Sequence, residues 1–167
     1  MLFSIVCCAG FAQQAKVVEC SGFESTYSAL LTDKSKSALD FISTVKNGVA
    51  FYYIGHSMAY MDVKVLSFDG NDVTCFKNGT EKKTLAIKAK ERLNIIKLLD
   101  SFTEQKCYHS HFNKNEDLKV IAVIKDGVLL IRYLARGGLF PDKTSDSELN
   151  TLKELYEATA KFQYRDN

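Results

Sequence analysis

Apolar residues recur along the chain with two different spacings, which separate the expected helices from the expected strands. Four segments carry an apolar residue at every third or fourth position, the spacing that lines one face of an α-helix. These segments begin near Ser21, Lys34, Lys90 and Ser145. In the second segment the apolar stripe consists of Ala38, Phe41, Ile42 and Val45, in the third of Leu93, Ile95, Ile96, Leu98, Leu99 and Phe102, and in the fourth of Leu152, Leu155, Tyr156 and Thr159. We therefore predict four helices.

Between these segments the pattern alternates or is continuously apolar, as in β-strands. The predicted strands cover residues 49–54, 60–68, 73–76, 84–89, 106–112, 118–124 and 128–134. Short turn sequences such as Lys125-Asp126-Gly127 join several neighbours as hairpins, whose strands are antiparallel. We predict an α+β fold in which helices pack on a mainly antiparallel sheet, in the order ααβββ(β)αβββα.

Composition narrows the class of protein. A chain of 167 residues with 46% hydrophobic and 25% charged residues is typical of one globular domain. The net charge of +2 gives no reason to expect a polyanionic partner. The run from Lys77 to Lys97 holds seven basic residues but almost no aromatic residues between them, so we interpret it as solvent-exposed and expect no nucleic-acid binding.

The first residues, MLFSIVCCAGFAQQ, are apolar and uncharged, and small residues precede Gln13. We predict a signal peptide over 1–12, cleaved after Ala12, and a single α+β domain over 13–167. The alternatives are a core strand or helix, and a lipoprotein signal at Cys7 or Cys8. The apolar run is too short for a transmembrane segment. We therefore expect a periplasmic or secreted protein.

Removal of the signal peptide would leave three cysteines, Cys20, Cys75 and Cys107. An odd number permits at most one disulfide within the chain. A bridge from Cys20 would keep the N-terminal segment attached to the domain. The expected disulfide is therefore Cys20–Cys107 or Cys20–Cys75, and the sequence does not choose between them.

Metal-binding and catalytic signals are weak. The sequence Cys107-x-His109-x-His111 would place three possible zinc ligands on one side of a strand. Its polar flanks, and the competing role of Cys107 in a disulfide, favour a surface histidine pair instead. Neither a Gly-x-Ser-x-Gly motif nor a catalytic cysteine signature is present. We assign no catalytic residue, metal or cofactor, and favour a protein that is not an enzyme.

One segment has the composition of an interaction surface. Between Asn47 and Met61 the chain has no charged residue, and it includes Tyr52, Tyr53, His56 and Tyr60. Aromatic residues are enriched in protein–protein interfaces. The alternative for residues 49–54 is a central strand that is buried on both faces.

These observations lead to one preferred function and two rivals. The preferred hypothesis is an exported binding protein, an inhibitor or immunity-type protein that blocks a partner protein such as a toxin or hydrolase. The second is a periplasmic protein that binds a metal or a small ligand through His109 and His111. The third is a hydrolase whose site the sequence does not reveal.

Overall fold

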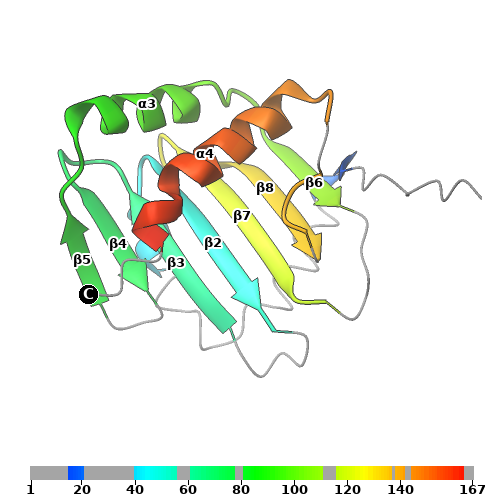
Figure 1. Ribbon diagram of the computed structural model, residues 1–167, viewed down its shortest axis with the longest axis horizontal. Coiled ribbons are helices and arrows are strands. Elements are labelled where there is room, and N and C mark those ends of the chain that lie inside the picture. Colours follow the sequence, from blue (N-terminus) through cyan, green and yellow to red (C-terminus); the bar gives the residue numbers. More distant parts are fainter. Residues whose placement is uncertain are drawn as a thin grey trace, which may run out of the picture.

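The computed structural model describes residues 15–20, 40–55, 61–77, 81–110, 116–136, 138–141 and 144–163. Within them, one eight-stranded sheet has the order β1-β6-β8-β7-β2-β3-β4-β5 (Figure 1). The strands are β1 (Ala15–Val18), β2 (Gly48–Ile54), β3 (Met61–Ser67), β4 (Val73–Lys77), β5 (Glu81–Leu85), β6 (Lys106–Ser110), β7 (Leu118–Lys125) and β8 (Val128–Arg136). The helices are α3 (Ala89–Asp100) and α4 (Ser147–Gln163). Among the ladders between described strands only β6–β8 is parallel, so the predicted α+β fold with a mainly antiparallel sheet is confirmed.

Several boundaries differ from the predicted ones. Strand β1 was not predicted, and β5 begins at Glu81 instead of Thr84. Helix α3 ends at Asp100, so Phe102, the last residue of the predicted apolar stripe, follows the helix. The helix expected from Ser21 and the segment 1–12 lie outside the described residues, and the helix expected from Lys34 is described only from Asp40.

Helices α3 and α4 lie across the same face of the sheet, where Figure 1 shows them as neighbours. Each turns its apolar stripe towards the strands, and the fully buried members are Ile95, Leu99, Leu152 and Leu155. Thr159 is also buried, and its hydroxyl donates to the Leu155 carbonyl at 2.8 Å. Leu93, which we predicted as part of the α3 stripe, is 55% exposed instead. Its position on the helix turns it away from the sheet.

The opposite face of the sheet has its own apolar cluster. Phe41 and Val45 pack there against residues of β2, β3, β4 and β7. The Phe41 and Phe76 rings stack with their centroids 5.0 Å apart. Both faces of the central strands are therefore covered. This explains why β2 is buried and continuously apolar and does not alternate between apolar and polar residues.

A disulfide joins Cys20 to Cys107 on this second face. Of the two bridges expected from the sequence, the structure therefore contains Cys20–Cys107. Cys75, half-buried on β4, is not part of a disulfide. The disulfide and the β1–β6 ladder, in which Val18 pairs with Cys107, attach the segment 15–20 to the sheet.

Two local features fix the chain at one end of β2. Asp69 accepts hydrogen bonds from the backbone N–H groups of Lys46 and Asn47, at 3.0 and 2.7 Å. Gly48 follows directly, and a Cβ atom there would lie 2.5 Å from the Leu66 carbonyl oxygen. Only glycine allows this approach between β2 and β3.

Among the described residues, neither helix combines the length and the apolar character needed to cross a membrane.

Candidate functional site

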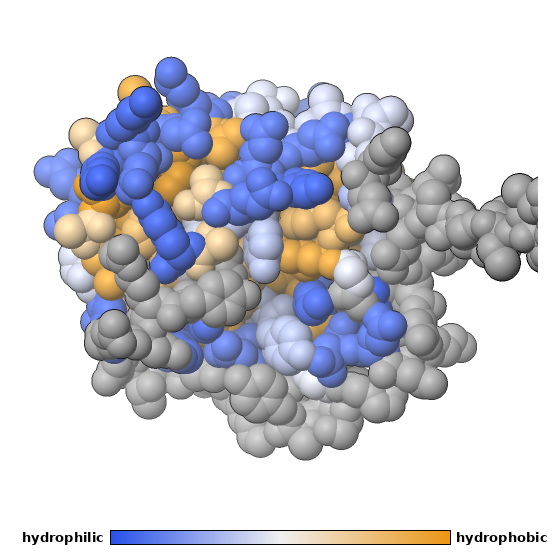
Figure 2. Space-filling model, viewed as in Figure 1, coloured by the Kyte–Doolittle hydropathy of each residue, from blue (hydrophilic) through white to orange (hydrophobic). Residues whose placement is uncertain are grey.

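A pocket of about 340 Å³ opens on the helix-bearing face of the sheet. Residues of β2, β3 and β7 form its floor, and Tyr156 of α4 and Leu139 form its wall. Figure 2 shows an apolar area beside α4 on this face, bordered by hydrophilic residues. Figure 1 shows that α4 crosses the sheet and leaves the lower ends of β2, β3 and β7 uncovered, and the lining residues Tyr53, Asp62 and Lys119 belong to these ends.

The strand register places the floor residues in two rows across the sheet. In the row nearer α4, Phe51 of β2 has Lys64 of β3 on one side and Ile121 of β7 on the other. In the second row, Tyr53 lies between Asp62 and Lys119. Side chains two residues apart on a strand point to the same face, so both rows face the pocket.

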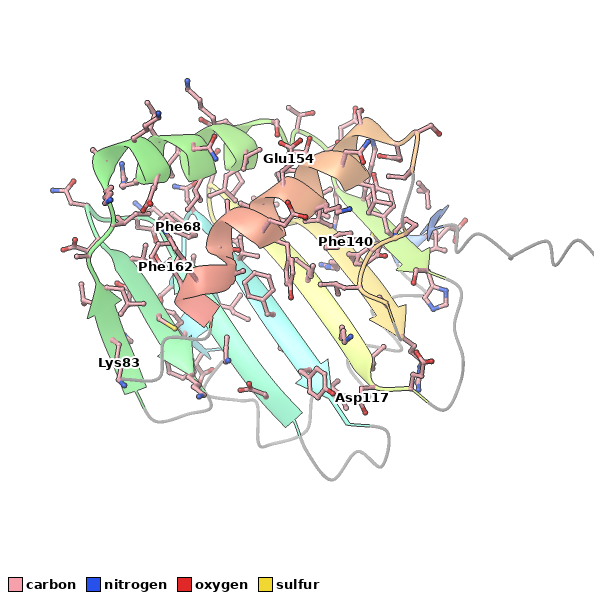
Figure 3. The ribbon with its side chains drawn as sticks, viewed as in Figure 1. Phe68, Lys83, Asp117, Phe140, Glu154 and Phe162 are labelled. Atoms are coloured by element: carbon pink, nitrogen blue, oxygen red, sulfur yellow. A yellow bond between two sulfur atoms is a disulfide. The ribbon has the colours of Figure 1, made fainter. Side chains whose placement is uncertain are left out.

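Stacked aromatic rings build the wall. The Tyr156 ring meets Phe51 edge to face, with the centroids 5.7 Å apart, and lies at the same distance from Phe140. Phe140 stacks on Tyr133 of β8 at 5.1 Å. Figure 3 labels Phe140 where the 138–141 segment lies beside α4. These contacts hold the segment against the helix and keep the wall of the pocket in place.

Charged groups line the other side. Lys64 Nζ lies 3.5 Å from Asp62 Oδ2, and these side chains are only 12% and 17% exposed. The other Asp62 oxygen, Oδ1, is buried and has no hydrogen-bond partner within the described part of the chain. Tyr53, 37% exposed, donates a hydrogen bond from its hydroxyl to Asp117, the residue before β7, which is labelled in Figure 3. With Lys119, the lining holds two ammonium groups and one carboxylate.

The pleat of β2 separates two residues that the sequence grouped together. Tyr53 faces the pocket, whereas the Tyr52 side chain is 2% exposed and belongs to the apolar cluster on the opposite face. Of the four interface residues expected from the sequence, Tyr53 therefore lies at the site and Tyr52 is a core residue. His56 and Tyr60 lie outside the described residues.

Of the possible zinc ligands, the structure describes Cys107 and His109, both on β6. Cys107 is bonded to Cys20, so it offers no thiolate while the disulfide is intact. His109 is exposed on β6, and His111 lies outside the described residues. Within the described ranges, no three His, Cys, Asp or Glu side chains are grouped as metal ligands would be.

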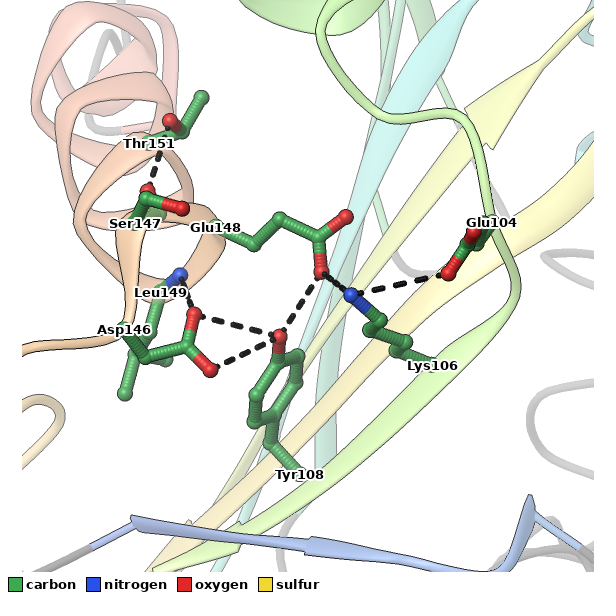
Figure 4. A network of polar contacts seen from close by, with 8 residues as sticks. All are labelled: Glu104, Lys106, Tyr108, Asp146, Ser147, Glu148, Leu149 and Thr151. Carbon is green, nitrogen blue, oxygen red and sulfur yellow. Dashed lines mark hydrogen bonds and ion pairs between the residues drawn. The ribbon is translucent and has the colours of Figure 1, made fainter.

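A second polar cluster joins β6 to the start of α4 (Figure 4). The Tyr108 hydroxyl lies 3.0 Å from Glu148 Oε2 and 3.4 Å from Asp146 Oδ1. Lys106 Nζ lies 2.7 Å from the same Glu148 oxygen. Asp146 Oδ1 also accepts the Leu149 backbone N–H at 2.9 Å, as an N-cap residue does. The sequence pattern had placed the start of this helix near Ser145, one residue before this cap.

Burial and the nearby carboxylates change the acid–base behaviour of this cluster. Burial, followed by the hydrogen bond to Glu148, raises the pKa of Tyr108 above its ordinary value. The hydrogen bond with Glu148 also raises the pKa of Lys106 above its ordinary value. Every strong partner in this cluster is another member of it, so its evident role is to fix α4 on the sheet.

The residues that line the pocket come from five separate parts of the chain. Of these residues the sequence analysis had selected Tyr53, as part of the uncharged aromatic segment. A signal that it did not use was the presence of three charged residues, Asp62, Lys64 and Lys119, in strands whose neighbouring residues are apolar. That pattern indicates an uncovered strand end.

Comparison of the chain with protein-family models, curated proteins and solved structures gave no match.

Proposed function

We propose that this protein is an exported, non-catalytic binding protein that holds a partner protein at the pocket beside Tyr53. The observation that carries the proposal is the composition of the pocket: an apolar floor at Phe51 and Ile121, two tyrosines, and charged groups at one side. Buried aromatic anchors surrounded by polar groups dominate the binding energy of protein interfaces. An inhibitor or immunity-type protein that blocks a toxin or hydrolase needs such aromatic anchors to bind its target tightly.

The chemistry of the lining supports binding more than catalysis. Among the described lining residues, the titratable side chains on the pocket's face of the sheet are those of Asp62, Lys64, Lys119, Tyr53 and Tyr156. Lys64 and Asp62 contact each other, and Tyr53 contacts Asp117. Groups held in such pairs orient a ligand by charge and hydrogen bonding.

Export is supported by the Cys20–Cys107 disulfide, since such bridges persist in oxidising compartments and are rare in the cytosol. The protein isolated from its native host is expected to begin at Gln13 or within two residues of it. Intact mass measurement tests this, and a mass that includes Met1 would contradict export by cleavage after Ala12.

The binding function is tested with immobilised full-length protein and an extract of its native host. Wild type is expected to retain one protein, and Tyr53→Ala to retain at least tenfold less, because truncated aromatic anchors cost this much or more. Val128→Ala is the matched control, since Val128 is 55% exposed at the distant β7–β8 turn.

The retained partner is then purified, and calorimetry measures its affinity for wild type, Tyr53→Ala and Val128→Ala. The proposal requires one-to-one binding in which Tyr53→Ala binds at least tenfold more weakly than wild type and Val128→Ala binds as tightly as wild type. Equal retention by wild type and Tyr53→Ala would show that the pocket does not carry the function.

One observation favours a small ligand as the second candidate. A volume of about 340 Å³ lies at the lower end of the range of small-molecule sites, which is about 300–1,000 Å³. A ligand retained from the host would appear as extra mass under native conditions and disappear on denaturation. Its loss in Tyr53→Ala, without a retained protein, would favour this candidate.

A further inference from the structure

We propose that the pocket binds a tyrosine side chain of the partner, whose ring packs against Phe51 and Tyr156 and whose hydroxyl donates a hydrogen bond to Asp62. This inference rests on the proposed function and adds the chemical class of the group that the pocket accepts.

The first observation is a carboxylate oxygen that lacks a donor. Asp62 lines the pocket from β3, and its Oδ2 lies 3.5 Å from Lys64 Nζ. Its other oxygen, Oδ1, is buried and has no hydrogen-bond partner among the described residues. A buried acceptor without a donor is unfavourable, so a bound group that supplies a donor gains free energy here. The torsion that turns an Asp carboxylate is broad, so a small rotation can offer an unpaired oxygen to a donor in the pocket.

The second observation is the pair of aromatic rings at the other side of the pocket. The Tyr156 ring meets the Phe51 ring at 72°, with the centroids 5.7 Å apart. Aromatic rings prefer edge-to-face or offset contacts with one another, which contribute beyond the burial of their area. A ring bound beside Phe51 and Tyr156 gains such contacts, and an aliphatic side chain does not. The volume of about 340 Å³ suits one ring with its substituent.

The strand register puts the two requirements within reach of one side chain. Phe51 lies opposite Lys64 on β3, and Asp62 is two residues before Lys64 on the same strand. Two residues span about 6.6 Å along a strand and neighbouring strands lie about 4.8 Å apart, so the Phe51 and Asp62 backbones are separated by roughly 8 Å. A ring that packs on Phe51 can therefore direct a hydroxyl at its far end towards Asp62.

The charges around the pocket favour a neutral group. Tyr53 holds the Asp117 carboxylate at the side of the pocket. With it, the described charged groups are two carboxylates and two ammonium groups, those of Asp62, Asp117, Lys64 and Lys119. These charges balance, so they attract neither an anion nor a cation as such. A tyrosine hydroxyl is uncharged at neutral pH and donates one hydrogen bond.

The test uses isotope-labelled full-length protein and three small probes followed by NMR: N-acetyl-tyrosinamide, its O-methyl ether and N-acetyl-leucinamide. All are expected to shift the amide signals of Phe51, Asp62 and Ile121. The tyrosine probe should bind about tenfold more tightly than its ether, which has no hydroxyl proton to donate, because a hydrogen bond to a charged group contributes at least this factor. The leucine probe should bind about threefold more weakly than the ether, because it lacks the ring.

The variant Asp62→Asn separates the hydrogen bond from the size of the methyl group. Lys64 would hold the amide oxygen of the new side chain, so its NH2 group, a donor, would face the ligand. Both the hydroxyl and the ether oxygen can accept from it, so the tenfold preference should be lost while the affinity for the ether stays unchanged. Asp72→Asn, at the exposed turn before β4, is the matched control and should keep the preference.

Four results would overturn the proposal: equal binding of the tyrosine probe and its ether in wild type, a preference that survives in Asp62→Asn, shifts away from the lining, or no binding at 10 mM, the order of concentration at which such small probes are tested. If Tyr53-dependent retention of a partner protein persists in any of these cases, the class of the bound group is wrong and the binding function stands.

Discussion

The Tyr108 hydroxyl contacts Glu148 at 3.0 Å and thereby connects strand β6 to the first turn of α4. Glu148 is also the ion-pair partner of Lys106, two residues before Tyr108 on the same strand. The helix that forms the wall of the pocket is thus positioned by a polar contact at its start and by apolar packing along its length. The rigidity of the pocket depends on both.

Tyr108→Phe removes the hydroxyl and leaves the ring in the core. The free energy of unfolding is expected to fall by about 1 kcal/mol, the net value of one such hydrogen bond. Urea denaturation measures this change. Ser147→Ala, at an exposed position on the same turn of α4, is the control and should alter stability by less than about 0.5 kcal/mol. A Tyr108→Phe variant as stable as wild type would show that the contact contributes nothing.

The same cluster predicts how stability changes at alkaline pH. Burial raises the pKa of Tyr108, and its contact with Glu148 raises that of Lys106, so the folded state binds these protons more tightly than the unfolded state. The stabilisation is complete below the ordinary pKa values, 10.0 and 10.5, and is lost as pH rises above them. We expect the urea midpoint to fall steeply above pH 10.

Tyr108→Phe should make that fall shallower without abolishing it, because burial also raises the pKa of Tyr133 to about 12. Identical pH profiles for wild type and Tyr108→Phe would contradict the assignment of this titration to Tyr108.

The Cys20–Cys107 bridge joins residues 87 positions apart. A crosslink over a loop of this length stabilises by about 4.6 kcal/mol in the chain-entropy model. The double variant Cys20→Ser/Cys107→Ser is expected to lose an amount of this order, measured by urea denaturation, and Cys75→Ser much less. Peptide mapping without reductant should recover Cys20 and Cys107 in one linked species. Recovery of Cys20 linked to Cys75 would contradict the structure.

Gly48 tests the packing of β2 against β3. In Gly48→Ala the new methyl group would lie 2.5 Å from the Leu66 carbonyl oxygen and 2.6 Å from a Val45 methyl group. The chain must shift, and we expect a loss of about 2 kcal/mol in unfolding free energy. Gly70→Ala is the matched control, because its Cβ would have no neighbour closer than 3.9 Å. Equal effects of the two substitutions would argue against the close approach.

Because Lys64 and Asp62 contact each other, we expect substitutions of the two residues to have non-additive effects on the free energy of unfolding. Lys64→Met leaves the mostly buried Asp62 carboxylate without its cation, so we expect a loss of about 2 kcal/mol or more. The double variant Lys64→Met/Asp62→Leu removes both charges and should recover most of that loss. A double variant less stable than either single variant would show that the pair is a net source of stability.

Local signals in the sequence predicted the elements that depend on neighbouring residues. The Asp126-Gly127 turn has φ values of 52° and 76°, as the expected hairpin requires. The stripe Leu152–Leu155–Thr159 of α4 is buried as expected. Strand β1 was missed because its four residues show no clear alternation, and they become a strand only by pairing with β6, about 90 residues later.

The candidate site was less accessible to sequence analysis for a related reason. Tyr52 and Tyr53 have the same side chain and adjacent positions, and only the direction of the pleat decides which of them reaches the pocket. Lys64, Phe51 and Ile121 become neighbours through the register of three strands. Register is set by the packing of the whole sheet, which a local pattern does not contain.

The position of β6 gives this edge of the sheet only long-range ladders. Strand β6 pairs with β8, where Lys106 lies opposite Ile131, and with β1, where Cys107 lies opposite Val18. In both ladders the paired residues are far apart in sequence, so the entropy of closing a long loop opposes each pairing until its contacts form. Contacts of this kind raise the contact order of a chain and slow its folding.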